Sequence, residues 1–93
     1  MPSPVVQKRF VLTTSSWTPI TVPQSCTQIH VGNDDTTNAA AMRTDPNDSD
    51  TERVLYPGQN FSFITAGSFE PGMVVVYVKA SSGSGPAVAT YVR

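Results

Sequence analysis

The most strand-like stretch of this 93-residue chain is Phe69-Glu-Pro-Gly-Met-Val-Val-Val-Tyr-Val-Lys-Ala80. Its apolar run from Met73 to Val78 is the longest in the sequence, and nearly every residue in it favours a β-strand. Because side chains alternate along a strand, the even-numbered valines point to one side while Val75 and Tyr77 point to the other. Both faces are apolar. The pattern predicts a central strand covered on each side, by a second sheet, by the chain's own arm or by another subunit.

The rest of the chain contains further strand-sized segments separated by turn residues. Thr27–Val31 alternates, with Ile29 and Val31 on the inward face, as is typical of a half-buried strand. Pro19 marks an edge strand or a bulge, because proline cannot donate a backbone hydrogen bond within a sheet. The other predicted strand segments are 5–13, 17–22, 39–43, 53–56, 60–65 and 87–92.

These segments predict an all-β fold, a small antiparallel β-sandwich of jelly-roll type with seven to eight short strands and no helix. We expect Ala87–Val92 to pair with Met73–Lys79 as a hairpin across the Gly/Ser-rich segment between them. The polar segment Thr44–Thr51 is predicted to be an exposed loop, and Pro57-Gly58 a type II turn. We interpret residues 1–9 as an extended N-terminal arm or first strand and residues 10–93 as a single β-sandwich domain.

Charge and composition exclude several classes of function. Charged residues make up 14% of the chain, against an average of about 25%, and the net charge at pH 7 is −1. The basic surface that phosphate backbones require is therefore missing, and we expect no nucleic-acid partner. Since the longest apolar run is far shorter than the ~20 residues that span a bilayer, we also expect no membrane partner. Residues 1–10 lack the apolar segment of a signal peptide, which predicts synthesis in the cytoplasm.

The residues that carry chemistry do not form a recognisable catalytic motif. His30 is the only histidine, no Gly-x-Ser-x-Gly sequence is present, and His30 is expected on the exposed face of its strand. Cys26 lies about 13 Å from His30 along a strand, so the two do not form a local dyad. One cysteine and one histidine also cannot supply a zinc site. We therefore expect a protein without catalytic residues, cofactor or metal ligands.

Two binding hypotheses stay open, one for residues 44–52, which we call the acidic loop, and one for the aromatic residues. In the loop, Asp45, Asn47 and Ser49 match the first ligand positions of an EF-hand. Asp50, however, stands where glycine is required, and Tyr56 stands where the last glutamate should be, so only a calcium site of another type stays open. The aromatic residues are candidates for a platform that stacks on sugar rings, although small β-sandwiches more often use such residues in the core or at an interface. The four aromatic candidates are Trp17, Tyr56, Tyr77 and Tyr91.

The order of these signals resembles the small β-sandwich structural proteins of tailed bacteriophage virions, in particular the head decoration (cement) proteins. The residues that carry the resemblance are Trp17-Thr-Pro-Ile-Thr-Val-Pro23, Ile29-His-Val-Gly-Asn33, a short strand with Arg43, Leu55-Tyr-Pro-Gly-Gln-Asn-Phe61 and Tyr77-Val-Lys-Ala-Ser-Ser-Gly83. The resemblance covers most of the chain, and its motifs are turn residues rather than catalytic signatures.

The resemblance implies a non-enzymatic virion protein on the capsid exterior. Its partners would be the major capsid protein, whose lattice it stabilises from outside, and further copies of itself, as a trimer ahead of a dimer. The alternative is a phage tail or fibre module that binds a host-surface glycan through exposed aromatic residues. The residues expected to contact the capsid or a sister subunit are Val5, Val6, Lys8, Arg9, Phe10, Trp17, Val75 and Tyr77.

Overall fold

The computed structural model describes residues 5–93, and the first four residues of the predicted arm lie outside the described part of the chain. Eight strands form two four-stranded antiparallel sheets, which confirms the predicted small β-sandwich. The strands are β1 (Val5–Leu12), β2 (Thr18–Thr21), β3 (Cys26–Asn33), β4 (Ala40–Arg43), β5 (Arg53–Leu55), β6 (Asn60–Phe69), β7 (Val74–Ala80) and β8 (Gly85–Val92), with one 3-10 turn, η1 (Ser49–Thr51), before β5. No helix within the described residues is long and apolar enough to cross a membrane.

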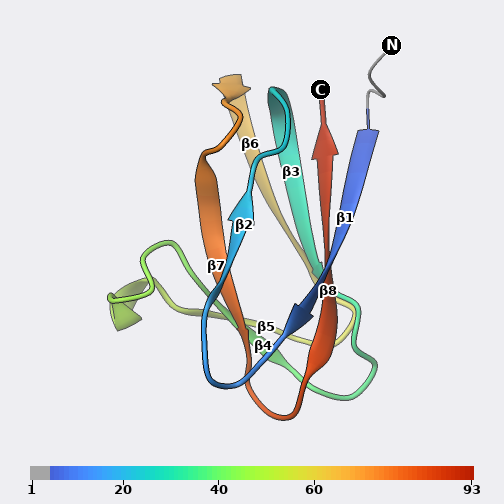
Figure 1. Ribbon diagram of the computed structural model, residues 1–93, viewed down its shortest axis with the longest axis vertical. Coiled ribbons are helices and arrows are strands. Elements are labelled where there is room, and N and C mark those ends of the chain that lie inside the picture. Colours follow the sequence, from blue (N-terminus) through green and yellow to red (C-terminus); the bar gives the residue numbers. More distant parts are fainter. Residues whose placement is uncertain (1–4) are drawn as a thin grey trace.

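The strands pair from the two ends of the chain inward. β1 pairs with β8, β2 with β7, β3 with β6 and β4 with β5, as in one long hairpin whose two arms run side by side. This hairpin is rolled so that β8 also pairs with β3, and β7 with β4. The result is sheet A, in the order β1-β8-β3-β6, facing sheet B, in the order β2-β7-β4-β5 (Figure 1). This arrangement is a jelly roll.

The predicted hairpin between β7 and β8 is wrong. β7 lies in sheet B between β2 and β4, whereas β8 lies in sheet A between β1 and β3. The connection after Ala80 therefore crosses from one sheet to the other, with Gly83 in the left-handed region at φ 63°. Backbone hydrogen bonds from Ala80 to Thr13 (3.0 Å) and from Ser81 to Ala39 (3.2 Å) fix the start of this crossing. Alternation identifies the faces of a strand but not its neighbours, so sequence could not distinguish a hairpin from a crossing.

β7 is the central strand that the sequence predicts, but residues 5–93 place a second layer over only one of its faces. The inward side chains Val76, Val78 and Ala80 are buried in the core. Val75 and Tyr77 on the outward face are only half-buried, and no other described segment forms a layer over them. The apolar outer face of sheet B is therefore left for solvent or for another molecule.

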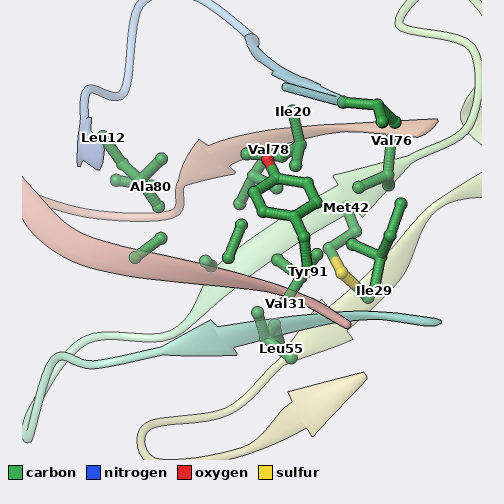
Figure 2. Packing of buried hydrophobic residues seen from close by; sticks show 14 of the residues in the cluster. Leu12, Ile20, Ile29, Val31, Met42, Leu55, Val76, Val78, Ala80 and Tyr91 are labelled. Atoms are coloured by element: carbon green, nitrogen blue, oxygen red, sulfur yellow. The ribbon is translucent and has the colours of Figure 1, made fainter. Parts of the chain in front are cut away.

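The core between the sheets is built around Tyr91, whose side chain is fully buried (Figure 2). From β8 in sheet A it reaches across the sandwich, where its hydroxyl donates a hydrogen bond of 2.9 Å to the carbonyl oxygen of Thr21 at the end of β2. Burial raises the pKa of Tyr91 to about 12. Tyr91 is therefore excluded from the predicted aromatic platform. The residues packed in this core are Leu12, Ile20, Val22, Cys26, Ile29, Val31, Ala40, Met42, Leu55, Val76, Val78, Ala80, Ala87, Ala89 and Tyr91.

The first strand is an integral edge of sheet A. β1 pairs with β8 along its whole length, from Val5 opposite Val92 to Leu12 opposite Gly85. Residues 5–9, which the sequence assigned to an arm or first strand, form the first part of this strand. Figure 1 shows the start of β1 and the end of β8 at the same end of the molecule.

Two turns are built from a proline–glycine pair, and the first is the one that the sequence predicts. At Pro57-Gly58, Gly58 has φ 77°, and the N–H of Gln59 donates to the carbonyl of Tyr56 at 2.9 Å. At Pro71-Gly72, Gly72 has φ 86° and a similar hydrogen bond of 3.2 Å closes the turn before β7. A positive φ at the third turn position is the signature of type II, which confirms the predicted turn at Pro57-Gly58.

Asn33, at the end of β3, joins three segments at one end of the sandwich. It is 3% exposed, and its amide nitrogen donates to the carbonyl oxygens of Asn38 (2.9 Å) and Leu55 (3.0 Å). Its amide oxygen accepts from the N–H of Asp35 at 3.0 Å. Hydrogen bonds from the backbone N–H groups of Thr37 and Asn38 lower the pKa of the Asp35 carboxyl group. Both the amide nitrogen and the amide oxygen of Asn33 therefore have structural partners.

We predict that Asn33→Asp destabilises the fold by about 2 kcal/mol, because two buried carbonyl groups lose their donor and face a carboxylate of the same shape. For a domain of this size the melting temperature should fall on the order of 10 °C. Thermal unfolding monitored by circular dichroism measures this shift. Asn47→Asp, in the exposed loop, is the matched control and should leave the melting temperature nearly unchanged. Equal effects of the two substitutions would contradict this role of Asn33.

Candidate functional site

The outer face of sheet B carries an unusual concentration of apolar and aromatic side chains. Across the strands, Pro19 pairs with Tyr77 and Tyr77 with Arg43, and in the next row Ala41 pairs with both Lys79 and Val54. The outer face of an antiparallel sheet is normally polar where it meets water. We call this surface the Trp17 face, and its side chains are Trp17, Pro19, Ala41, Arg43, Val54, Val75, Tyr77 and Lys79.

Two cations bind the indole ring of Trp17 to this face. The guanidinium carbon of Arg43 lies 4.8 Å from the ring centroid and the ammonium nitrogen of Lys79 lies 4.7 Å from it. Both distances are within the range of cation–π attraction. Trp17 precedes β2, whereas Arg43 ends β4 and Lys79 lies on β7, so the cluster joins three segments that are distant in sequence.

Arg43 also holds the acidic loop against the sheet. Its Nε and Nη2 atoms contact Glu52 Oε1 at 2.9 and 2.8 Å, and its Nη1 donates to the carbonyl oxygen of Pro46 at 2.9 Å. The Arg43 side chain is 20% exposed and that of Glu52 is 40% exposed. Partial burial and two-atom contact make this ion pair stronger than a typical surface pair. Arg43 therefore couples the position of Trp17 to that of the loop.

The acidic side chains of the loop cap its own backbone. Asp45 Oδ1 accepts from the N–H of Asn47 at 2.9 Å, and Asp48 Oδ1 accepts from the N–H of Asp50 at 3.0 Å, where it caps η1. The loop is largely exposed, as predicted. Within residues 5–93, no three His, Cys, Asp or Glu side chains come together in a way that could hold a metal ion.

The outer face of sheet A contains a shallow polar groove of about 740 Å³. Exposed Val5, Val11 and Ile64 lie on the same face, outside the groove. One cross-strand row runs from Gln7 through Thr90 and His30 to Ser62. Gln7 Nε2 donates to Thr90 Oγ1 at 3.2 Å, and His30 Nδ1 lies 2.7 Å from Ser62 Oγ. The side chain of Asn60 lies over Gly32, where a Cβ atom would collide with it. The groove is lined by Gln7, Arg9, His30, Gly32, Asn33, Asp34, Gly58, Asn60, Ser62, Val88 and Thr90.

The chemistry of this groove is hydrogen bonding. The short contact between His30 and Ser62 places a base beside a hydroxyl group, as in hydrolases, but the other ring nitrogen of His30 faces the amide oxygen of Gln28 at 3.3 Å. A triad uses a carboxylate at that place. Cys26 is buried in the core, and burial raises the pKa of its thiol, which keeps it protonated at neutral pH.

The structure divides the predicted interface residues among several surfaces. Trp17, Val75 and Tyr77 lie together on the Trp17 face, although Val75 is also packed against the core. Arg9 lies in the polar groove, where it pairs with Asp34 at 3.1 Å. The remaining four are on β1: Val5 and Lys8 are exposed, whereas Val6 and Phe10 pack against the core.

Sequence reasoning missed Arg43 and Lys79 as members of the Trp17 face. Lys79 continues the outward alternation of Val75 and Tyr77, so the sequence alone could have placed it on the same face. The role of Arg43 depends on the pairing of β4 with β7, and this pairing is not visible in the sequence.

Comparison with known proteins gives no relative on which to base a function. No family model matches this chain, and neither the curated proteins nor the solved structures contain a match. The class that the structure defines is an eight-stranded jelly roll with an apolar, aromatic outer face on sheet B and a polar groove on the outer face of sheet A. Any function must therefore be argued from these two faces.

We predict that Arg43→Met loosens both the acidic loop and Trp17, because it removes one of the two cations over the ring together with the hydrogen bonds to Glu52 and Pro46. The expected loss of stability is about 1 kcal/mol, since the ion pair is partly exposed. Trp17 is the only tryptophan, so its fluorescence reports this cluster alone. Acrylamide should quench that fluorescence more strongly in the variant. Arg53→Met, which removes an exposed arginine on β5, is the control, and equal quenching in both variants would contradict the prediction.

Proposed function

We propose that this chain is a non-enzymatic structural protein of a phage virion, a decoration subunit that binds the outer surface of the major capsid protein lattice and stabilises the head. The observation that carries the proposal is the Trp17 face. A small domain that presents an apolar and aromatic sheet surface has a strong reason to bury it against another protein.

The composition of the Trp17 face supports a protein partner. Tyrosine, tryptophan and arginine are the residues most enriched where protein interfaces bind tightly, and all three lie here in one cluster. The indole and the guanidinium already hold each other in place, and Arg43 is fixed by Glu52. Little side-chain entropy would therefore be lost on docking.

The proposed mechanism is the addition of buried area at the joints of the lattice. A subunit that spans two neighbouring capsid proteins must detach before the joint can open, so its binding free energy adds to that of the lattice contact. The jelly-roll framework suits this role because its backbone hydrogen bonds lie within two sheets that resist bending. The fold alone does not select this function, since jelly rolls occur in viral capsid domains and in lectins.

We predict that Tyr77→Ser weakens binding to capsid shells at least tenfold, because Tyr77 lies at the centre of the Trp17 face and its ring is lost from the interface core. The measurement is cosedimentation of the purified chain with expanded shells assembled from the major capsid protein of the same virus. Melting temperatures of the variants show whether they remain folded.

Tyr56→Ser is the matched control for this experiment. Tyr56 is 61% exposed at the turn after β5 and lies outside the Trp17 face. The control should bind like the unmodified chain. The proposal is wrong if the unmodified chain does not sediment with shells, or if both variants weaken binding equally.

The polar groove of sheet A supports a second candidate function, recognition of a host-surface glycan by a tail or fibre module. Its amide, hydroxyl, imidazole and guanidinium groups can donate and accept hydrogen bonds from sugar hydroxyls. The proposed ligand is an uncharged oligosaccharide, because the one ion pair in the groove, Arg9 with Asp34, is already neutralised. The site differs from the aromatic platform that the sequence suggested.

For this second candidate we predict that Thr90→Val reduces glycan binding several-fold, because it removes a hydroxyl group from the middle of the groove without changing the shape of the side chain. Binding is measured on immobilised bacterial surface glycans with no capsid present. Thr21→Val, on an exposed position of β2, is the control. Absence of binding by the unmodified chain would rule the candidate out.

A further inference from the structure

The four edge strands of the sandwich differ in how they are protected from pairing with another chain. β1 carries Lys8 and Arg9, β2 has four residues with Pro19 and a register shift, and β5 has three residues including Arg53. Charges, proline and shortness are the devices that keep edges from pairing. β6, the other edge of sheet A, is ten residues long and contains no charged residue and no proline.

The straight part of this open edge is Asn60–Ile64. These residues pair in unbroken register with β3, from Gly32 opposite Asn60 to Gln28 opposite Ile64. The register then shifts before Cys26 meets Phe69, so residues 65–68 form a bulge that bends the edge away. Ser62 lies at the centre of the straight part.

The sequence around Ser62 is symmetric in its side-chain character. Phe61 and Phe63 flank it on the inward face, and their ring centroids lie 5.1 Å apart. Phe61 is 40% exposed, which is a large apolar surface left open at an edge. Beside these rings, between the edges of the two sheets, lies an apolar groove of about 340 Å³ whose rim carries both Asp50 and Arg53.

We propose that a second copy of this chain pairs with β6 through its own β6, antiparallel, about a two-fold axis at Ser62. Ser62 then lies opposite the partner's Ser62, and Phe61 lies opposite the partner's Phe63. Because paired residues in an antiparallel ladder share a face, all four phenylalanine rings meet on the core side of the joined sheet. Sheet A continues into the partner as one eight-stranded sheet.

Self-pairing fits this edge better than other occupants for reasons of charge and symmetry. A two-fold interface requires a surface that complements itself, and an uncharged Phe-Ser-Phe segment brings no like charges together. The groove rim carries one acidic and one basic side chain, so it can also face its own copy. Pairing of β6 with the β1 edge of a neighbour would instead bring Lys8, which is on the core side of β1, beside the phenylalanine rings, and it would not close into a two-fold dimer. The inferred assembly is a dimer, where the phage resemblance implied a trimer ahead of a dimer.

The test places charges on the proposed axis. Ser62→Lys brings two ammonium groups directly opposite each other, and Ser62→Glu brings two carboxylates together. Gln7→Lys is the matched control, because Gln7 lies at the other end of the same cross-strand row, on the β1 edge of sheet A. Each substitution replaces an exposed side chain that makes one hydrogen bond within that row. Sedimentation equilibrium over a range of concentrations gives the dimer dissociation constant.

The expected result is a dimer for the unmodified chain and for Gln7→Lys. The dimer dissociation constant of each Ser62 variant alone should be at least tenfold higher. An equal mixture of Ser62→Lys and Ser62→Glu should restore the dimer at low salt, because opposite charges then meet on the axis. Unchanged melting temperatures at concentrations where all chains are monomeric would show that the folds are intact.

Four outcomes would overturn the pairing. They are a monomer at all concentrations, a trimer, dimers that survive both Ser62 substitutions, or a Gln7→Lys variant whose dimer is weakened as much as those of the Ser62 variants. The last outcome would mean that the two edges of sheet A meet head to tail. No capsid is present in this experiment, so its result is independent of the proposed binding to shells.

Discussion

The constraint on which the whole structure depends is the pairing of the two ends of the chain. β8 lies in the middle of sheet A only because β1 covers its other side, from Val5 opposite Val92 to Leu12 opposite Gly85. Each strand pair of the rolled hairpin encloses the pairs that lie closer to the β4–β5 connection. Closing such nested loops costs little extra entropy when the inner pairs are already formed, because the cost rises only with the logarithm of loop length. The outermost pair remains the longest closure, and a topology of this kind folds slowly.

Local pattern was sufficient to predict the elements but not their partners. The alternation of Ile29 and Val31 with polar neighbours placed β3 correctly, and two proline–glycine pairs marked the turns where they occur. The hairpin between β7 and β8 failed because two apolar strands joined by a flexible segment can pair or can cross between sheets with the same local sequence. Tyr91 illustrates the same limit. An aromatic residue near a chain end is equally compatible with a surface platform and with the centre of a core, and only the position of β8 between β1 and β3 decides.

The two outer faces of the sandwich differ in chemistry, and this follows from which strands the rolling brings together. Sheet B unites the outward residues of β7 with Arg43 and Val54, which produces an apolar surface with fixed cations. Sheet A unites outward Gln7, Thr90, His30 and Ser62, which produces a polar groove. A molecule that docks through its apolar face would present this polar groove outward. The same asymmetry leaves the β6 edge accessible from the side, so lateral pairing and docking through the face do not compete for one surface.

The adjacency of the two ends of the described chain has a mechanical consequence. Val5 and Val92 are opposite each other at one end of an antiparallel pair, so a force that separates the termini acts on one rung of the ladder at a time. Such unzipping requires little force, because the hydrogen bonds break in succession. A load that slides the two strands past each other would strain all the rungs together and would require much more force. A tether attached at the chain ends would therefore peel β1 away early, whereas tension applied along the strand direction of either sheet would be shared across its hydrogen bonds.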